Sequence, residues 1–146
     1  EFALIRSDVL MNLECNILVT MPNADTMGGI IRNELNKVAN KNSNIYLVES
    51  LGSEGYYSAL NKCDLVLGNS SSGILEAASF SKYVINVGNR QLGREYGNNV
   101  IHCKINKNEI FQAIKQIEEL PKLDTFNIYG DGNARFKIIS ELKKMK

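Results

Sequence analysis

The residues with the clearest chemical potential lie between Leu65 and Glu76. An apolar run, Leu65-Val66-Leu67, leads into Gly68-Asn69-Ser70-Ser71-Ser72-Gly73 and then into a helix-like stretch. A buried strand that opens directly into a helix gathers backbone N–H groups and the positive end of the helix dipole. Serine hydroxyls can donate to phosphate oxygens at such a place. A second interpretation is that Ser71 or Ser72 caps the helix and the rest is a tight connection.

Glu76 stands three residues beyond Gly73, in the first turn of a helix that we expect from Ile74 to about Phe80. One interpretation makes it the acidic partner of a serine N-cap in a capping box. The other makes it a carboxylate that accepts two hydrogen bonds from a ribose diol, as acidic residues do in many nucleotide sites. The local pattern leaves both open.

Two of the chain's five arginines, Arg90 and Arg94, lie in the glycine-flanked loop that follows the next expected strand. Consecutive strands of such folds usually end side by side, so this loop is expected near the serine-rich turn. A guanidinium there could clamp a diphosphate with two hydrogen bonds. The alternative is a solvated loop in which Arg94 pairs with Glu95 or Glu54 at the surface.

A catalytic constellation is not evident. His102 is the single histidine and sits in an apolar strand context, which favours a structural role. A triad of serine, histidine and acid would need His102, whose apolar strand context does not suit that role. No pair of carboxylates has recognisable acid/base spacing. The sequence therefore indicates one half of a site, the half that binds.

Short Ile-, Val- and Leu-rich runs alternate with segments of helical period, which is typical of an α/β protein with a parallel sheet. We expect a Rossmann-like sheet with helices on both faces. The expected strands are residues 16–20, 45–48, 64–67, 83–87 and 99–103; the expected helices fall within 2–13, around 30–38, 56–62, 74–80 and 107–120, and after the turn at 129–133.

Composition narrows the function classes. The 146 residues predict one domain, residues 1–146, and 44% hydrophobic content suffices for a globular core. A net charge of +1 argues against nucleic acid or an anionic membrane as partner. With three widely spaced cysteines and one histidine, neither a disulfide framework nor a structural zinc site is expected. No signal peptide or membrane-spanning run is recognisable, which predicts a cytoplasmic protein.

Four motifs in order resemble the hydrolysing UDP-N-acetylglucosamine 2-epimerases of sialic acid biosynthesis and their relatives in legionaminic acid pathways. They are Pro22-Asn23-Ala24-Asp25 with Gly28-Gly29, Gly68 to Glu76, Gly88-Asn89-Arg90-Gln91-Leu92-Gly93-Arg94, and Tyr129-Gly130-Asp131-Gly132-Asn133-Ala134. The resemblance implies the C-terminal half of a GT-B-like fold of two Rossmann-like domains, with the site in the cleft between them. The N-terminal domain, which carries the family's catalytic carboxylates, has no counterpart here, so we expect a piece of a longer enzyme.

The same resemblance implies roles for individual residues. Ser70 and Ser71 would donate to the phosphates of UDP, Glu76 would accept the ribose hydroxyls, and Arg90 would reach the nucleotide from the following loop. In the segment Glu49-Ser50-Leu51-Gly52, Leu51 is the expected contact to uracil. Asn23 matches a family residue near the ligand. Asp25, Arg94 and Asp131 belong to motifs whose roles we expect to be structural: turn, loop and cap.

In the complete enzyme the resemblance implies that UDP is eliminated from UDP-GlcNAc to give a 2-acetamidoglucal, to which water adds to give N-acetylmannosamine. The implied partners are UDP, a UDP-amino sugar and the enzyme's own N-terminal domain, and the full-length enzyme could form a homo-oligomer. No metal or redox cofactor is implied. We expect no catalytic residue in this chain and no turnover by it alone.

Three alternatives stay open at this point. The substrate could be UDP-diacetylbacillosamine instead of UDP-GlcNAc. The domain could be of the phosphosugar isomerase type, because those domains also place a serine-rich, glycine-ended loop between a strand and a helix. It could also be a non-catalytic nucleotide sensor or assembly module.

Overall fold

The computed structural model describes residues 8–22, 28–124 and 127–145. After a helical turn at residues 8–10, strands and helices alternate along the chain. The labelled elements are β1 (Ile17–Thr20), α2 (Gly28–Ala39), β2 (Ile45–Val48), α3 (Gly52–Lys62), β3 (Leu65–Gly68), α4 (Ser71–Leu75), η1 (Ala77–Phe80), β4 (Tyr83–Val87), β5 (Val100–Cys103), α5 (Lys107–Glu118) and α6 (Ala134–Lys144). The predicted α/β alternation is confirmed.

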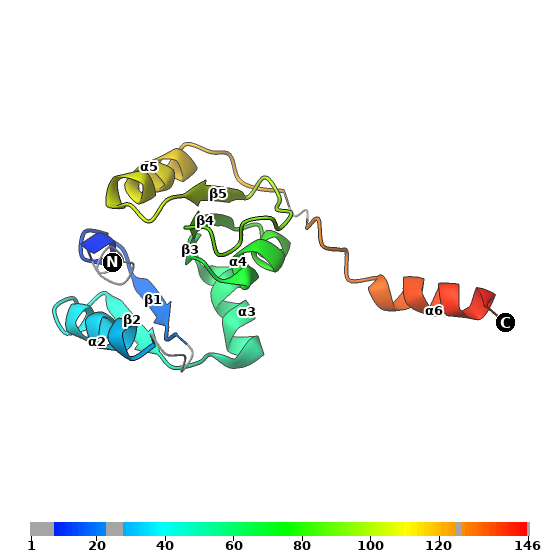
Figure 1. The fold of residues 1–146 in the computed structure, drawn as a ribbon, viewed down its shortest axis with the longest axis horizontal. Coiled ribbons are helices and arrows are strands. Elements are labelled where there is room, and N and C mark those ends of the chain that lie inside the picture. The colour runs from blue at the N-terminus through cyan, green and yellow to red at the C-terminus, as the bar shows by residue number, and fades with distance from the viewer. Residues whose placement is uncertain (1–7, 23–27, 125–126, 146) are drawn as a thin grey trace.

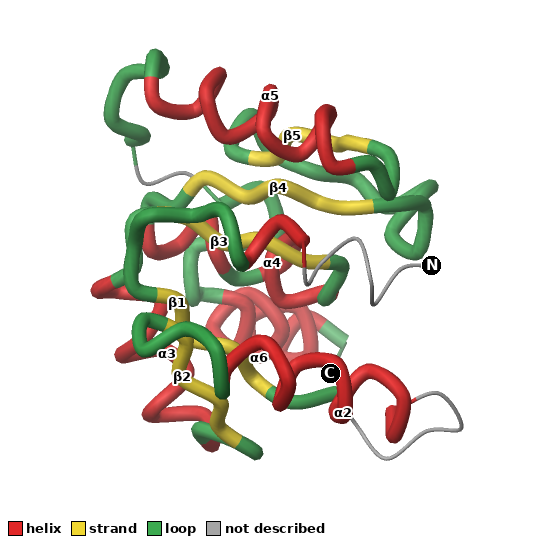
Figure 2. Tube along the Cα trace, turned by 90° about the vertical axis from the view of Figure 1, so that its left-hand side faces the viewer, coloured by secondary structure: helices red, strands yellow, loops and turns green. Residues whose placement is uncertain are grey.

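The strands pair in parallel, as expected, but they form two sheets. β1 pairs with β2, and β4 lies between β3 and β5 (Figures 1 and 2). In the second sheet Gly68 at the end of β3 stands opposite Asn86 in β4. The loops after these two strands therefore leave from neighbouring strand ends, as the predicted topology requires.

Helices cover both faces of the three-stranded sheet because successive residues of β4 point to opposite sides. On one side Val84 packs with Leu60 of α3 and with Ile74 and Ala77, which come from α4 and η1. On the other side Ile85 and Val87 pack with Ile110 and Ala113 of α5. A strand buried on both faces needs a nearly continuous apolar run, and β4 has one.

The two-stranded sheet has a core of its own. Leu35 and Val38 on α2 pack against Ile45 of β2 together with Leu10. The neighbouring residue, Val9, instead belongs to the cluster beneath β4 and α5. The helical turn at residues 8–10 thus contributes one apolar side chain to each core and connects the two sheets by packing where no strand pairing joins them.

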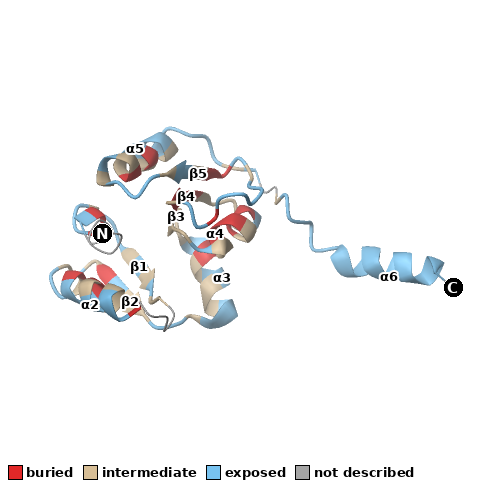
Figure 3. Cartoon of the chain, viewed as in Figure 1, coloured by how far each residue is buried: buried red, intermediate tan, exposed pale blue. Residues whose placement is uncertain are grey.

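Helix α6 projects away from both sheets (Figure 1), and every described residue of it is exposed (Figure 3). Its apolar side chains Phe136, Ile138, Ile139 and Leu142 are 49–59% exposed. None of them packs into the cores formed by the rest of the described chain. Among the described residues, no helix combines the length and the apolar character that crossing a membrane would need.

Candidate nucleotide site

A cavity of about 450 Å³ opens at the carboxyl ends of β1 and β2. Ligands of open α/β folds bind at this edge of the strands, so its position agrees with the expected site. The cavity is lined by residues that end β1, connect β2 to α3, begin α3 and follow α4: Thr20, Met21, Glu49, Ser50, Leu51, Gly52, Ser53, Tyr56, Tyr57 and Glu76. Leu51 and Glu76, predicted from distant parts of the sequence, thus share one cavity.

The connection from β2 to α3 forms one wall. Gly52 begins α3 with a φ of +59°, a left-handed backbone conformation that glycine adopts without a steric penalty. The N–H of Gly52 donates to Oγ of Ser50 at 3.2 Å. Because the chain turns here, α3 begins four residues before the predicted start at Tyr56 and places Tyr56 and Tyr57 in its first two turns, facing the cavity. The pair of adjacent tyrosines shortly after the predicted ligand loop at residues 49–52 was the signal that the sequence interpretation missed.

The serine-rich turn is capped by Ser70. Its Oγ accepts the N–H of Ser72 at 3.4 Å, so the capping serine is Ser70, and the prediction of Ser71 or Ser72 as N-cap was wrong. The single helix expected from Ile74 to Phe80 was also wrong: α4 has only five residues and η1 follows as a 3-10 turn. A helix this short has only a small dipole. Any attraction for an anion must therefore come from the hydroxyls and the local N–H groups.

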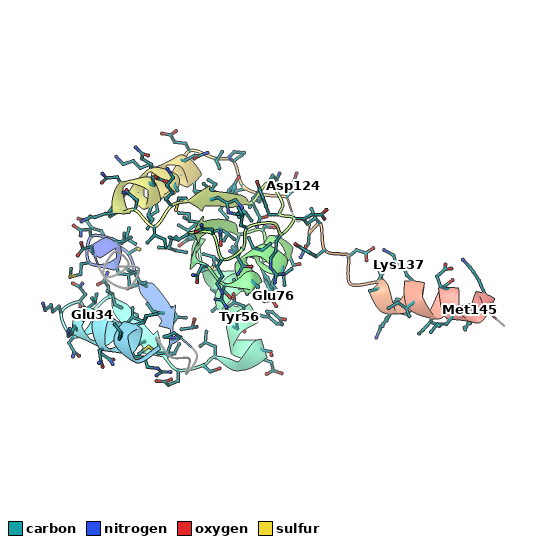
Figure 4. The ribbon with its side chains drawn as sticks, viewed as in Figure 1. Glu34, Tyr56, Glu76, Asp124, Lys137 and Met145 are labelled. Atoms are coloured by element: carbon teal, nitrogen blue, oxygen red, sulfur yellow. The ribbon has the colours of Figure 1, made fainter. Side chains whose placement is uncertain are left out.

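Glu76 lies at the break between α4 and η1. The backbone N–H of Glu76 donates to the carbonyl of Ser72, and Glu76 is the C-cap residue of α4. Because Glu76 does not lie in the first turn of the helix, the capping-box interpretation was wrong. Its side chain receives a hydrogen bond from the Ser72 hydroxyl, 2.9 Å between Oγ and Oε2. The Tyr56 hydroxyl bonds to the same Ser72 oxygen. Figure 4 shows Tyr56 and Glu76 next to each other between α3 and α4.

The ring of Tyr56 is held by the hydrophobic core. Its half-buried ring packs against the cluster of Leu60, Ile74 and Val84. Burial, the main cause, raises the pKa of the Tyr56 hydroxyl, the hydrogen bond with Ser72 opposes the rise, and the nearby Glu76 charge adds to it. Tyr56 therefore keeps its proton and acts as a hydrogen-bond donor at neutral pH.

Arg90 lies in the loop after β4, beside the serine-rich turn. The buried Gln91 next to it donates from Nε2 to the carbonyl of Asn69 at 2.9 Å. Arg90 and Arg94 are exposed, and the backbone N–H of Arg94 donates to the carbonyl of Gln91 at 3.2 Å. Within the described chain the guanidinium of Arg94 forms no ion pair with Glu95 or Glu54, the pairing considered above. Arg90, Ser70 and Ser71 are not among the residues that line the 450 Å³ cavity.

A second ionic feature borders the cavity and was not foreseen. Arg32 on α2 pairs with Glu49 at 2.6 Å and donates a further hydrogen bond to the carbonyl of Pro22 at 3.1 Å. The hydrogen bond from Arg32 lowers the pKa of Glu49. A carboxylate at the rim would repel an anionic ligand, and the paired arginine offsets that charge. The two residues are 17 positions apart, so the pair has no local sequence signal.

Asn23, the remaining predicted contact, lies outside the described residues. His102 does not reach the cavity. Its Nδ1 is 2.9 Å from Nδ2 of the buried Asn86, and its ring meets Tyr96 edge-on at 4.4 Å between centroids. These contacts fit the structural role that the sequence favoured.

A second cavity, of about 390 Å³, lies between Leu75 and the segment from Asn127 to Lys137. Asp131 lines it and accepts hydrogen bonds from the backbone N–H of Asn133 and from Lys137. These bonds, the one from Asn133 first, lower the Asp131 pKa to about 2. Asp131 thus organises the turn that leads into α6, but the N-cap of α6 is Asn133, so the expectation of Asp131 as the cap itself was wrong.

The described residues contain no cluster of three or more His, Cys, Asp or Glu side chains placed to hold a metal ion. The three cysteines, Cys15, Cys63 and Cys103, carry free thiols. The chemistry that the described site offers is hydrogen bonding to hydroxyl, phosphate and base groups, together with arginine at its border.

Comparison with known proteins identifies the family of the chain. The family model of UDP-N-acetylglucosamine 2-epimerase matches residues 3–143. A UDP-N,N'-diacetylbacillosamine 2-epimerase (hydrolyzing) of Legionella pneumophila is 34% identical over 141 residues, 97% of this chain and 37% of that protein. A GDP/UDP-N,N'-diacetylbacillosamine 2-epimerase (hydrolyzing) of Campylobacter jejuni is 38% identical over 112 residues, 76% of this chain and 28% of its own length.

A UDP-N-acetylglucosamine 2-epimerase of Neisseria meningitidis is 32% identical over 120 residues, 82% of this chain and 31% of that protein. This chain therefore spans little more than a third of the Legionella relative and less of the other two. Because the family model covers nearly the whole chain, the chain belongs to the UDP-N-acetylglucosamine 2-epimerase family.

Proposed function

We propose that this chain is the UDP-binding domain of a hydrolysing UDP-sugar 2-epimerase. The observation that carries the proposal is the cavity at the carboxyl ends of β1 and β2, which brings Leu51 and Glu76 together although they are far apart in the sequence. Backbone groups around Leu51 would hold uracil, and the Glu76 carboxylate would accept hydrogen bonds from the ribose hydroxyls.

The diphosphate would lie over the serine-rich turn beside this cavity. Ser70 accepts the N–H of Ser72, yet its hydroxyl still has a proton to donate, and the half-buried Ser71 adds a second hydroxyl. Arg90 is exposed on the neighbouring loop, which Gln91 holds against Asn69. Its guanidinium can donate two hydrogen bonds to phosphate oxygens.

In the reaction that we propose, UDP leaves the anomeric carbon of UDP-GlcNAc as a proton leaves C2, which gives a 2-acetamidoglucal. Water then adds to give N-acetylmannosamine, a precursor of sialic acid-type sugars. Ser70, Ser71 and Arg90 would stabilise the negative charge that grows on the departing UDP. The proton transfers would fall to a further domain, and the greater lengths of the relatives support the presence of one in the complete enzyme.

A second substrate, UDP-N,N'-diacetylbacillosamine, is supported by the names of the Legionella and Campylobacter relatives. Both substrates carry the same UDP group and differ in the sugar. The residues described here would contact the shared part, so the choice between the two substrates belongs to the sugar-facing side of the cleft.

The test is isothermal titration of this chain with UDP, using Arg90→Ala and Ser71→Ala as variants. Loss of one charge-assisted hydrogen bond costs about 1.5–3 kcal/mol, so each variant should bind UDP roughly tenfold or more weakly. Arg135→Ala on α6 and Ser58→Ala on the exposed side of α3 are matched controls, because neither residue lines the cavity. They should bind UDP like the parent chain.

Glucosamine 6-phosphate in place of UDP separates the alternatives. Saturable binding of the sugar phosphate with no binding of UDP would transfer the assignment to the phosphosugar isomerase type. UDP binding with turnover of UDP-GlcNAc by this chain alone would contradict the division of the active site between two domains. UDP binding without any activity after the preceding domain is restored would favour the sensor alternative.

A further inference from the structure

The side chain of Glu76 is held by two residues that the proposed UDP contacts do not include. We propose that Ser72 and Tyr56 are positioning residues that orient the Glu76 carboxylate for the ribose hydroxyls, an inference that rests on the proposed function. Ser72 Oγ donates to Glu76 Oε2 at 2.9 Å, and the Tyr56 hydroxyl bonds to Ser72 Oγ. The three side chains form a connected row from the core to the cavity.

The direction of this row follows from the number of protons. An ionised carboxylate can only accept hydrogen bonds, whereas a serine hydroxyl has one proton to give. The Ser72 proton is therefore directed at Glu76, and Ser72 must accept the proton of Tyr56. Each bond polarises the next one, which strengthens a row of this kind relative to its separate bonds.

The row starts from a rigid support. The Tyr56 ring packs against Leu60 and Ile74, both of which are at most 3% exposed. Ser72 and Glu76 are one helical turn apart, with the Glu76 N–H bonded to the Ser72 carbonyl at 2.9 Å, so their side chains project to the same side of α4. Backbone and side-chain contacts thus both restrict where the carboxylate can point.

The consequence for a ligand concerns Oε1 of Glu76. Among the described residues Oε1 accepts no hydrogen bond, while Oε2 is held by Ser72. A carboxylate fixed at one oxygen presents the other to the cavity at little further cost in side-chain entropy, and this pre-organisation increases affinity. Without the row, Glu76 would sit at a helix break with its side-chain rotamers free, and the discrimination that depends on ribose would decline.

The readout is the preference for UDP over 2'-deoxy-UDP, measured by titration of this chain. That ratio reports on ribose recognition and cancels effects common to both ligands, such as partial misfolding or altered phosphate contacts. We expect the parent chain to prefer UDP by about tenfold, as for one charge-assisted hydrogen bond. Glu76→Ala should bring the ratio to about one.

Ser72→Ala should reduce the preference to about threefold or less, and Ser72→Thr, which keeps the hydroxyl, should restore it. Tyr56→Phe keeps the ring in the core and removes only the first donor, so it should lower the ratio without unfolding the chain. Tyr46→Phe is the matched control, because Tyr46 is 54% exposed on β2 and does not line the cavity.

The outcomes separate this inference from the function on which it rests. A parental ratio in both Ser72→Ala and Tyr56→Phe, with Glu76→Ala still at about one, would overturn the positioning role and leave the UDP site intact. A parent chain that does not bind UDP, or a parental ratio in Glu76→Ala, would overturn the proposed ribose contact itself. A ratio lowered by Ser72→Ala and restored by Ser72→Thr supports the inference.

Discussion

Replacement of Gly73 by alanine should destabilise the fold, because α4 crosses β4 at Gly73 with no room for a methyl group. A Cβ at Gly73 would stand 2.9 Å from Cγ1 of Val84. Ordinary contacts begin at about 3.4 Å, so Val84 or α4 would have to move by about 0.5 Å. Val84 is 2% exposed and packs with Ile74 and Ala77, which are equally enclosed, so neither side can move freely.

The expected magnitude is the difference between two terms. Overpacking of a filled core costs about 1–3 kcal/mol, and the β-branched side chain of Val84 has few rotamers with which to relax. Alanine in place of glycine in a helix gains about 0.5–1 kcal/mol. The two terms leave a net loss in the free energy of unfolding of about 0–2.5 kcal/mol for Gly73→Ala, centred on about 1 kcal/mol.

Gly29→Ala is the matched control, because Gly29 lies in α2 and a Cβ there would meet nothing within 4 Å. It should stabilise the chain by about 0.5 kcal/mol. Urea unfolding measures the free energy of unfolding of both variants. Far-UV circular dichroism is the suitable signal because the chain has no tryptophan to report by fluorescence and only six tyrosines. In a Val84→Ala background the clash is removed, so Gly73→Ala should become neutral or stabilising. Equal shifts for Gly73→Ala with and without Val84 would refute the packing argument.

Three further predictions concern the thiols, Asp131 and α6. Burial raises the pKa of Cys103 to about 11, so iodoacetamide at pH 8 should label the exposed Cys15 at least roughly tenfold faster than Cys103. Peptide mass spectrometry measures the two rates, and equal rates would contradict the burial of Cys103. The Asp131 pKa of about 2 is below its ordinary value of 3.8. The stability that Asp131 contributes is therefore present above pH 3.8 and is lost as pH falls through about 2. Titration of the carboxyl carbon by NMR should find a midpoint near 2, and a midpoint near 3.8 would contradict the shift. Removal of residues 134–146 should change the free energy of unfolding of the remaining chain by less than about 0.5 kcal/mol, since the described side chains of α6 are exposed. A larger loss of stability in urea unfolding would mean that α6 packs against the rest of the chain.

Much of the element order could be predicted from the sequence because the signals for strands and helices are local. The runs at Ile45–Val48 and Tyr83–Val87 are strands with the expected bounds, and the helix with Ile110 and Ala113 inward begins at Lys107 as expected. Apolar period and short-range turn residues suffice for such elements. Ordered motifs also identified the family, which the family model over residues 3–143 confirms.

The helix break at Glu76 was decided by packing over longer range. A continuous helix from Ile74 to Phe80 satisfied the local pattern, yet Ala77 is fully buried under β4 and the chain adopts a 3-10 turn there. Gly73, which looked like part of a ligand loop, is also the point where the helix approaches Val84. Burial of small residues against the sheet thus overrode the helical pattern.

By itself the sequence determined which segments become strands and helices, which residue types follow the strand ends, and to which family the chain belongs. Tertiary structure alone decided that the strands divide into two sheets, that Glu49 pairs with Arg32, and that Tyr56 reaches Glu76 through Ser72. Local elements depend on hydrogen bonds and periodicity within a few residues. The row from Tyr56 to Glu76 joins residues that meet only after α3 and α4 have packed against the same face of β4, so no local pattern could encode it.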